Sequence, residues 1–195
     1  GDFYEMFFFF FLVASKEMEI KLTGKSCGLD ERAPMCGIPY HAVEGYLSKL
    51  VSRGYKVAIC EQVEDPKLAK GLVKREVIRV VTPGTNLNVQ SLEAGKNNYL
   101  LSIAYTPDGI GISAADVTTG DYYVTEVEDL KKLNDELMKY EPSEIICNEA
   151  FLVSGFDVND LKSRLHISVN ALESHMFDDD GCRRILMKHF KVNTL

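Results

Sequence analysis

A stretch of small and polar residues at positions 84–98 is the feature that most limits how this chain can fold. It is rich in Gly, Asn, Gln and Ser and offers few apolar side chains that could anchor it in a core. Regular apolar patterns lie on both sides of it, as expected for two small domains joined by a linker. We therefore predict domains at residues 1–85 and 99–195, with the linker at 86–98.

The first half of the chain has the pattern of a small α/β domain with mixed strands. Residues 6–18 are apolar and then charged, which predicts a helix, and residues 24–34 contain the glycines, proline and charges of a loop. Apolar residues recur at i, i+3, i+4, i+7 and i+8 within residues 43–51, which predicts a second helix. Segments rich in Val and Ile predict strands at 55–60 and 73–81.

The second half has the element order of a ribonuclease H-like fold. Three consecutive apolar segments predict antiparallel strands, and a helix carrying Leu130, Leu133 and Leu137 crosses over to a fourth strand. A short strand near Ile167 and a helix over 180–190 follow. The pattern stops without an evident end, so this domain is expected to be incomplete. The four predicted strands are 99–105, 110–117, 122–127 and 144–147.

The net charge of −7 is distributed unevenly between the two halves. Residues 1–85 carry 12 Lys and Arg against 11 Asp and Glu, whereas residues 86–195 carry 10 against 18. The first half is therefore close to neutral, and electrostatics alone would give it only weak, salt-sensitive binding to nucleic acid. The acidic second half would suit the docking of a protein partner, so a protein-interaction module without contact to nucleic acid stays open as an alternative.

Cysteine usage and hydropathy indicate a cytoplasmic protein. The five cysteines are odd in number and form no Cys-x-x-Cys pair, which argues against a disulfide scaffold and a zinc knuckle. The four histidines are scattered without partners at ligand spacing, so no metal site is expected. The longest apolar run, residues 6–14, is too short for a membrane span, which needs about 18 residues. Because the first residue is not Met, we expect a piece of a longer protein.

Two segments invite an enzymatic interpretation. Gly24-Lys25-Ser26 resembles part of a phosphate-binding loop, but a Walker A loop needs a further glycine where this chain has Glu19. Asp116, at the end of a predicted strand, could be the first carboxylate of a metal-dependent nuclease. An Asp before Thr-Thr-Gly more often caps a turn, and no further carboxylates can be assigned to matching strands. We therefore predict no ATP binding, and we keep a ribonuclease H-type nuclease as the alternative function.

The segment Gly1-Asp2-Phe3-Tyr4-Glu5 places an aromatic ring and a carboxylate two positions apart. In an extended segment, residues i and i+2 point to the same side. Phe3 and Glu5 could then present a flat apolar face and a hydrogen-bond acceptor side by side. Spacing alone favours the other interpretation, a core Phe followed by a Glu at a helix start.

Five short segments follow one another in order: residues 1–5 (GDFYE), 34–42 (PMCGIPYHA), 58–62 (AICEQ), 80–85 (VVTPGT) and 116–120 (DVTTG). In order and spacing, the first four resemble the mismatch-recognition domain of the MutS family of DNA mismatch repair proteins. The fifth resembles the start of the connector domain of that family. The resemblance covers essentially the whole chain.

The resemblance implies a site and a fold. It implies that Phe3 wedges against a mispaired base from the minor groove and that Glu5 forms a hydrogen bond with that base. Tyr40, His41 and Arg79 are further candidates for DNA contact. It also implies a mismatch-recognition domain whose first strand precedes this chain, followed by an incomplete ribonuclease H-like connector domain.

The resemblance further implies what the chain does with other molecules. We expect no cofactor and no catalysis in this chain, because ATP and Mg²⁺ would be bound by the ATPase domain of the full-length protein. The expected partners are mismatched duplex DNA, a second copy in a homodimer of the full-length protein, and a MutL-type protein that meets the connector. A bacterial, nucleoid-associated location in the cytoplasm follows, with no membrane contact.

The chain departs from the family pattern in a run of five phenylalanines at residues 7–11. Family members usually have acidic or polar residues around Phe9 and Phe10, where the helix faces solvent. We therefore expect this apolar turn either to be buried against another surface or to reduce solubility.

Overall fold

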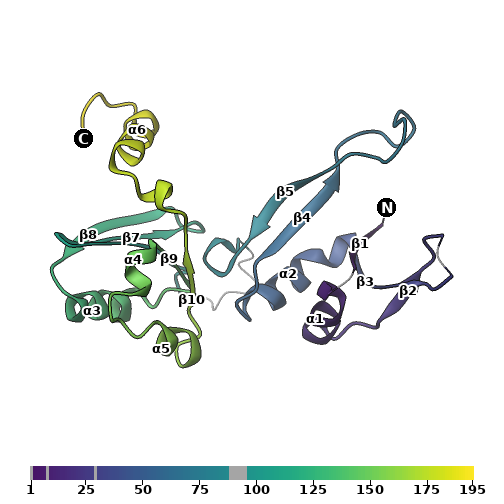
Figure 1. Cartoon of the computed structure of the whole chain (residues 1–195), viewed down its shortest axis with the longest axis horizontal. Helices are drawn as coiled ribbons and strands as arrows, with labels where there is room; N and C mark the ends of the chain where they lie inside the picture. Colours follow the sequence, from purple (N-terminus) through teal and green to yellow (C-terminus); the bar gives the residue numbers. More distant parts are fainter. Residues whose placement is uncertain (1, 8, 29, 88–95) are drawn as a thin grey trace. The chain divides into compact units, whose positions relative to one another are not determined.

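The chain divides into two compact units, Gly1–Lys96 and Asn97–Leu195, each with its own core. The predicted linker at 86–98 falls largely on residues 88–95, which lie outside the described residues. The computed structural model (Figure 1) describes residues 2–7, 9–28, 30–87 and 96–195.

The first unit consists of a three-stranded sheet, a two-stranded sheet and two α-helices (Figure 1). The strand order is β1-β3-β2 in the larger sheet, and β4 pairs with β5 in the smaller one. The elements are β1 (Phe3–Phe7), α1 (Phe9–Met18), β2 (Thr23–Lys25), β3 (Ala33–Pro39), α2 (Val43–Val51), β4 (Val57–Gln62) and β5 (Arg75–Val81), with short 3-10 helices η1 (Tyr40–Ala42) and η2 (Pro83–Thr85).

The α/β class predicted for this unit is confirmed, and its strands are arranged as two antiparallel sheets. Consecutive strands β2 and β3, and likewise β4 and β5, form hairpins, which join antiparallel strands. Parallel pairing is described only in the second unit, where β9 pairs with β6 and β10.

Two predicted boundaries in this unit were wrong. The first helix begins at Phe9, because Met6 and Phe7 instead pair with Cys36 and Met35 in the β1–β3 ladder. The predicted loop at 24–34 overlaps both β2 and β3, and β3 itself was not predicted. Glycine and proline are unusual inside strands, so the glycine and two prolines of β3 hid the strand in the sequence. The structure shows that alternate residues toward its end are buried, as in a strand with one side against the core.

Helix α2 holds the two sheets of the first unit together. Leu50 joins the core cluster formed with β3, whereas Leu47 and Val51 join the cluster that includes Ile59 of β4 and Val81 of β5. The spacing of these three leucine and valine side chains places them on one broad face of the helix, as its periodicity predicted. One helix therefore determines how the β4–β5 hairpin lies against the β1–β3–β2 sheet.

Helix α1 leaves two residues of the phenylalanine run exposed, whereas Phe11 packs against the core of the unit. Phe9 and Phe10 are 89% and 76% exposed, whereas Ala14 and Met18 are buried against β3. The apolar turn is therefore a surface feature of this unit, which leaves the expected effect on solubility in place.

The second unit is a five-stranded sheet with strand order β10-β9-β6-β7-β8. Strands β6, β7 and β8 are antiparallel neighbours, and β9 follows the crossover helix α3 to pair in parallel with β6, so the predicted ribonuclease H-like order is confirmed. The elements are β6 (Leu100–Thr106), β7 (Gly109–Asp116), β8 (Asp121–Val127), α3 (Leu130–Tyr140), β9 (Glu144–Cys147), α4 (Glu149–Leu152), α5 (Val158–Ser163), β10 (Ser168–Ala171), the 3-10 helix η4 (Ser174–Phe177) and α6 (Asp179–Phe190).

The core of the second unit lies between the sheet and the helices on one side of it, with α3 and α5 on that side (Figure 1). Leu133 and Leu137 of α3 are fully buried, and Asp129 caps this helix by accepting a hydrogen bond from the Lys132 N–H at 2.8 Å. Glu141 ends it in the left-handed conformation, one residue before Pro142. None of the described helices in either unit is long and apolar enough to cross a membrane.

Candidate nucleic-acid interface

Strand β1 presents Phe3 and Glu5 together on its exposed side. The strand is extended from Phe3 to Phe7, so alternate side chains point to opposite sides. Phe3 is 58% exposed and Glu5 is also exposed, whereas Tyr4 and Met6 are half-buried and pack against the core of the unit. An exposed aromatic ring therefore lies next to a carboxylate, as the extended interpretation of this segment predicted.

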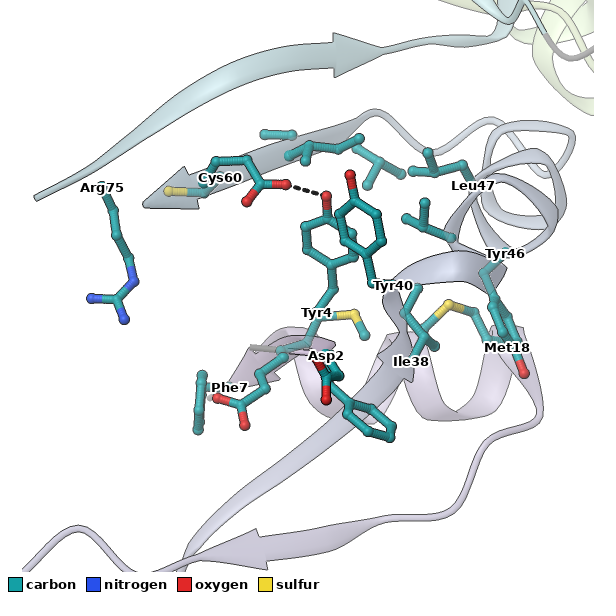
Figure 2. Close-up of a pocket in the computed structure, with 18 of the residues that line it drawn as sticks. Asp2, Tyr4, Phe7, Met18, Ile38, Tyr40, Tyr46, Leu47, Cys60 and Arg75 are labelled. Atoms are coloured by element: carbon teal, nitrogen blue, oxygen red, sulfur yellow. Dashed lines mark hydrogen bonds between the residues drawn. The ribbon is translucent and has the colours of Figure 1, made fainter. Parts of the chain in front are cut away.

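Tyr4 fixes β1 to the other sheet of the unit. Its hydroxyl donates a hydrogen bond to Glu61 Oε1 of β4, and its ring stacks on Tyr40 with centroids 5.5 Å apart (Figure 2). The hydrogen bond to Glu61, assisted by burial, raises the pKa of Tyr4 from 10.0 to about 12. The Tyr4 phenol thus stays protonated, and remains a hydrogen-bond donor, across the neutral range.

Gly37 of β3 allows this strand to lie close beside β1, which carries Phe3 and Glu5. It pairs directly with Glu5, and a Cβ at this position would lie 3.2 Å from the Tyr4 carbonyl oxygen and 3.9 Å from the Phe3 ring. A larger residue would have to displace the β1 backbone. The glycine of the PMCGIPYHA segment therefore keeps the strand that carries Phe3 and Glu5 tightly seated.

A pocket of about 880 Å³ opens between the β1–β3–β2 sheet and the β4–β5 hairpin. Tyr4 and Tyr40 point into it from one side, whereas Cys60 and Arg75 lie on the opposite side, along the hairpin (Figure 2). Phe3 and Glu5 belong to its lining. Polar and aromatic groups thus converge on the strand that carries the exposed pair.

The Glu5 carboxylate is engaged by a residue that sequence reasoning placed in a rejected ATP-binding motif. Lys25 Nζ of β2 lies 2.5 Å from Glu5 Oε2, and the two side chains are 51% and 32% exposed. Local sequence held no signal for this pair, because its members are 20 positions apart and on different strands. Glu61, the partner of Tyr4, was likewise not predicted as a site residue, although it lies within the segment AICEQ at residues 58–62.

The three further candidates for DNA contact lie in different surroundings. Tyr40 is brought to β1, where its ring stacks on Tyr4 and its backbone N–H donates to the Asp2 carbonyl at 2.9 Å. His41 is exposed on η1 next to it. Arg79 is on β5, where its guanidinium pairs with Glu44 of α2 at 2.9 Å. Only Tyr40 is therefore tied directly to the strand that carries Phe3 and Glu5.

Asp116 is a turn-capping residue in the second unit. Its carboxylate is buried and accepts hydrogen bonds from the Asn98 N–H at 2.9 Å, the Thr118 N–H at 2.8 Å and the Thr118 hydroxyl at 2.6 Å. Burial alone would raise its pKa, but these hydrogen bonds outweigh burial and lower it. Within the described residues no group of three or more His, Cys, Asp or Glu side chains could hold a metal ion. The geometry gives the nuclease alternative no support.

Comparison with known proteins covers both units. Residues 1–90 match the family model described as MutS domain I, and residues 98–195 match MutS domain II. The DNA mismatch repair protein MutS of Lachnoclostridium phytofermentans is 64% identical over 195 residues, which are all of this chain and 21% of that protein. The protein of the same name from Ruminiclostridium cellulolyticum is 50% identical over 198 residues, which are 100% of this chain and 23% of that protein. The chain thus spans about a fifth of the length of these curated relatives.

Proposed function

Because the chain belongs to the MutS family of DNA mismatch repair proteins, we propose that its first unit recognises mispaired and unpaired bases in duplex DNA. The observation that carries the proposal is the exposed pair of Phe3 and Glu5 on β1. A sheet, a stacked tyrosine and a hydrogen bond to a second sheet hold this strand in place. A rigid strand is a suitable support for a probe that has to enter the DNA stack.

Phe3 acts as an apolar wedge. Inserting a side chain between base steps costs a few kcal/mol of unstacking, and the cost is lower where pairing is already poor. Mispaired and looped sites are also easier to kink than paired DNA. Discrimination by deformability in this way works in any sequence context, which suits a protein that has to find errors throughout a genome.

Glu5 limits the binding of this site to paired DNA. A carboxylate in the minor groove is repelled by the surrounding phosphates whatever the sequence. It is tolerated where an available base edge donates a hydrogen bond to it, and it is penalised where no such donor is free. Glu5 therefore raises selectivity by opposing binding to paired DNA.

The second unit connects the first unit, which recognises the mismatch, to the remainder of the protein. Its ribonuclease H-like sheet supports a structural and coupling role, since Asp116 is used to cap a turn. We place ATP and Mg²⁺ in the ATPase part of the full-length protein, which acts as a homodimer in the bacterial cytoplasm. The acidic second half, with 18 Asp and Glu against 10 Lys and Arg in residues 86–195, provides a docking surface for a MutL-type partner.

Replacement of Phe3 by Ala in a full-length protein that carries this chain tests the wedge. The loss of one stacking contact removes about 1–3 kcal/mol, which is enough to abolish the preference for a mismatch. Fluorescence anisotropy with matched and mismatched duplexes at fixed salt measures the two dissociation constants. Phe10→Ala is the matched control, because Phe10 is exposed on α1 and lies outside the pocket lining.

The result for Phe3 separates the wedge from a purely structural aromatic residue. If Phe3→Ala keeps the preference of the wild-type protein for the mismatch, Phe3 is not the probe and the proposed site is wrong. If Phe10→Ala loses the preference as fully as Phe3→Ala does, the effect is not specific to β1.

Glu5→Gln tests whether the Glu5 carboxylate opposes binding to paired DNA. It is expected to tighten binding to matched duplex and to leave mismatch binding similar or weaker, because it removes a charge without removing the side chain. The same anisotropy assay gives the ratio of the two dissociation constants. Equal weakening of both complexes would identify Glu5 as a residue that only supports the structure.

A further inference from the structure

Lys25 reaches Glu5 from the far side of strand β3. In the β1–β3–β2 sheet, Lys25 pairs with Ala33 and Glu5 pairs with Gly37, so the lysine side chain crosses the sheet diagonally. Its ammonium group lies 5.8 Å from the centroid of the Phe7 ring and 2.5 Å from Glu5 Oε2. The lysine therefore lies on the same exposed side of β1 as the proposed probe.

This contact changes the charge that the site presents to DNA. An isolated carboxylate would repel the phosphates, whereas an ammonium group in contact with it cancels most of that field. Both side chains are partly exposed, at 51% and 32%, so the pair is held only weakly and a ligand can reach it. Contacts between DNA and either side chain can consequently replace the ion pair of Lys25 and Glu5.

We propose that Lys25 determines specificity by competing with DNA for the Glu5 carboxylate, an inference that rests on the proposed function of this site. On paired DNA no base edge replaces the lysine, so it stays on Glu5 and masks the repulsive charge. On mispaired DNA a base donates to Glu5, and the ammonium group has to leave the carboxylate. Lys25 thus moderates the penalty on paired DNA and opposes the engagement of Glu5 at a mismatch.

A plain phosphate contact by Lys25 is the competing explanation, and it makes a different prediction. A lysine that binds only phosphate strengthens every complex alike and carries no sequence information. Its removal would weaken matched and mismatched binding by the same factor, with or without Glu5. A lysine that acts through Glu5 changes the ratio of the two dissociation constants, and only while the carboxylate is present.

The experiment measures that ratio by fluorescence anisotropy at fixed salt in the full-length protein. The variants are Lys25→Met, Glu5→Gln and the double variant. Lys25→Arg keeps the charge at position 25. Lys49→Met is the matched control, because it removes the same charge from another partly exposed ion pair, Lys49 with Glu19 at 3.1 Å, away from the pocket lining.

Lys25→Met is expected to raise the preference for the mismatch about two- to fivefold, the range that an exposed ion pair can supply. Lys25→Arg and Lys49→Met should keep the wild-type ratio, and the double variant should have the ratio of Glu5→Gln alone. An unchanged ratio in Lys25→Met overturns the inference. So does a change of the same size in the Glu5→Gln background.

The outcome is distinguishable from a failure of the proposed function. If the wild-type protein shows no preference for the mismatch, or if Phe3→Ala keeps it, the proposed function fails before Lys25 is considered. If the wild-type preference depends on Phe3 and Lys25→Met leaves the ratio unchanged, the inference about Lys25 alone is wrong.

Discussion

Tyr4→Phe removes a single oxygen atom that links the two sheets of the first unit. The Tyr4 hydroxyl donates to Glu61, which is a half-buried carboxylate on β4. A hydrogen bond to a charged group contributes about 1.5–3 kcal/mol. Because Glu61 can still bind water after the change, and because the ring retains its stacking on Tyr40, we expect a smaller loss than this range, about 1–2 kcal/mol.

The pKa of Tyr4 defines the conditions for the measurement. Its folded-state value of about 12 exceeds the ordinary value of 10.0. The stabilisation by the protonated phenol is therefore fully present below pH 10 and is lost as the pH rises through 12. An experiment at pH 7 captures all of it.

Native-state hydrogen exchange, read by mass spectrometry on the whole chain, assigns the loss to one unit. A cost of 1–2 kcal/mol should speed exchange in β1 and β4 by a factor of about 5–30, and leave β6–β9 unchanged. Tyr55→Phe is the matched control, because Tyr55 is an exposed tyrosine of the same unit and no side-chain hydrogen bond is described for it. If Tyr4→Phe exchanges no faster than Tyr55→Phe, the hydroxyl does not hold β1 to the hairpin.

Three further predictions concern other parts of the chain. Asp116→Asn should destabilise the second unit at pH 7. Because the pKa of Asp116 is lowered, the greater stability of the wild-type protein should be present above pH 3.8 and be lost as the pH falls through the folded-state pKa. Urea unfolding at several pH values measures this difference in stability. Replacing the exposed Phe9 and Phe10 with Glu should raise solubility, measured by precipitation, without lowering the unfolding free energy; a large loss of stability would mean that the turn is packed. The chain should show no turnover of labelled ATP and no cleavage of duplex DNA with Mg²⁺ or Mn²⁺, and cleavage that disappears in Asp116→Asn would restore the nuclease alternative.

The sequence predicted the elements whose periodicity is regular over several turns or strands. Helix α2 and the strand order of the second unit followed from the spacing of apolar residues, because one face of each element has to be buried. For Phe3 and Glu5 the sequence offered side-by-side exposure only as the consequence of an extended segment, and the structure shows that the segment is extended. These are properties that a few neighbouring residues determine among themselves.

The sequence was less informative where one segment depends on another. Strand β3 has two prolines and a glycine, and it forms because β1 and β2 pair with it on both sides. The same pairing keeps Met6 and Phe7 in a strand, although they resemble the start of a helix. Ladder hydrogen bonds with a distant strand outweighed local propensity in both cases.

By itself, the sequence determined the periodic elements, such as α2, and its motifs indicated the family. The tertiary structure alone decided what the residues of β1 meet on either side: Lys25 on the exposed Glu5, 20 positions away, and Glu61 on the half-buried Tyr4, 57 positions away. A local pattern records which face of an element is buried, since each residue carries that preference itself. It holds no record of the partner, because pairing with β3 brings Lys25 to Glu5, and packing of the two sheets against α2 brings Glu61 to Tyr4.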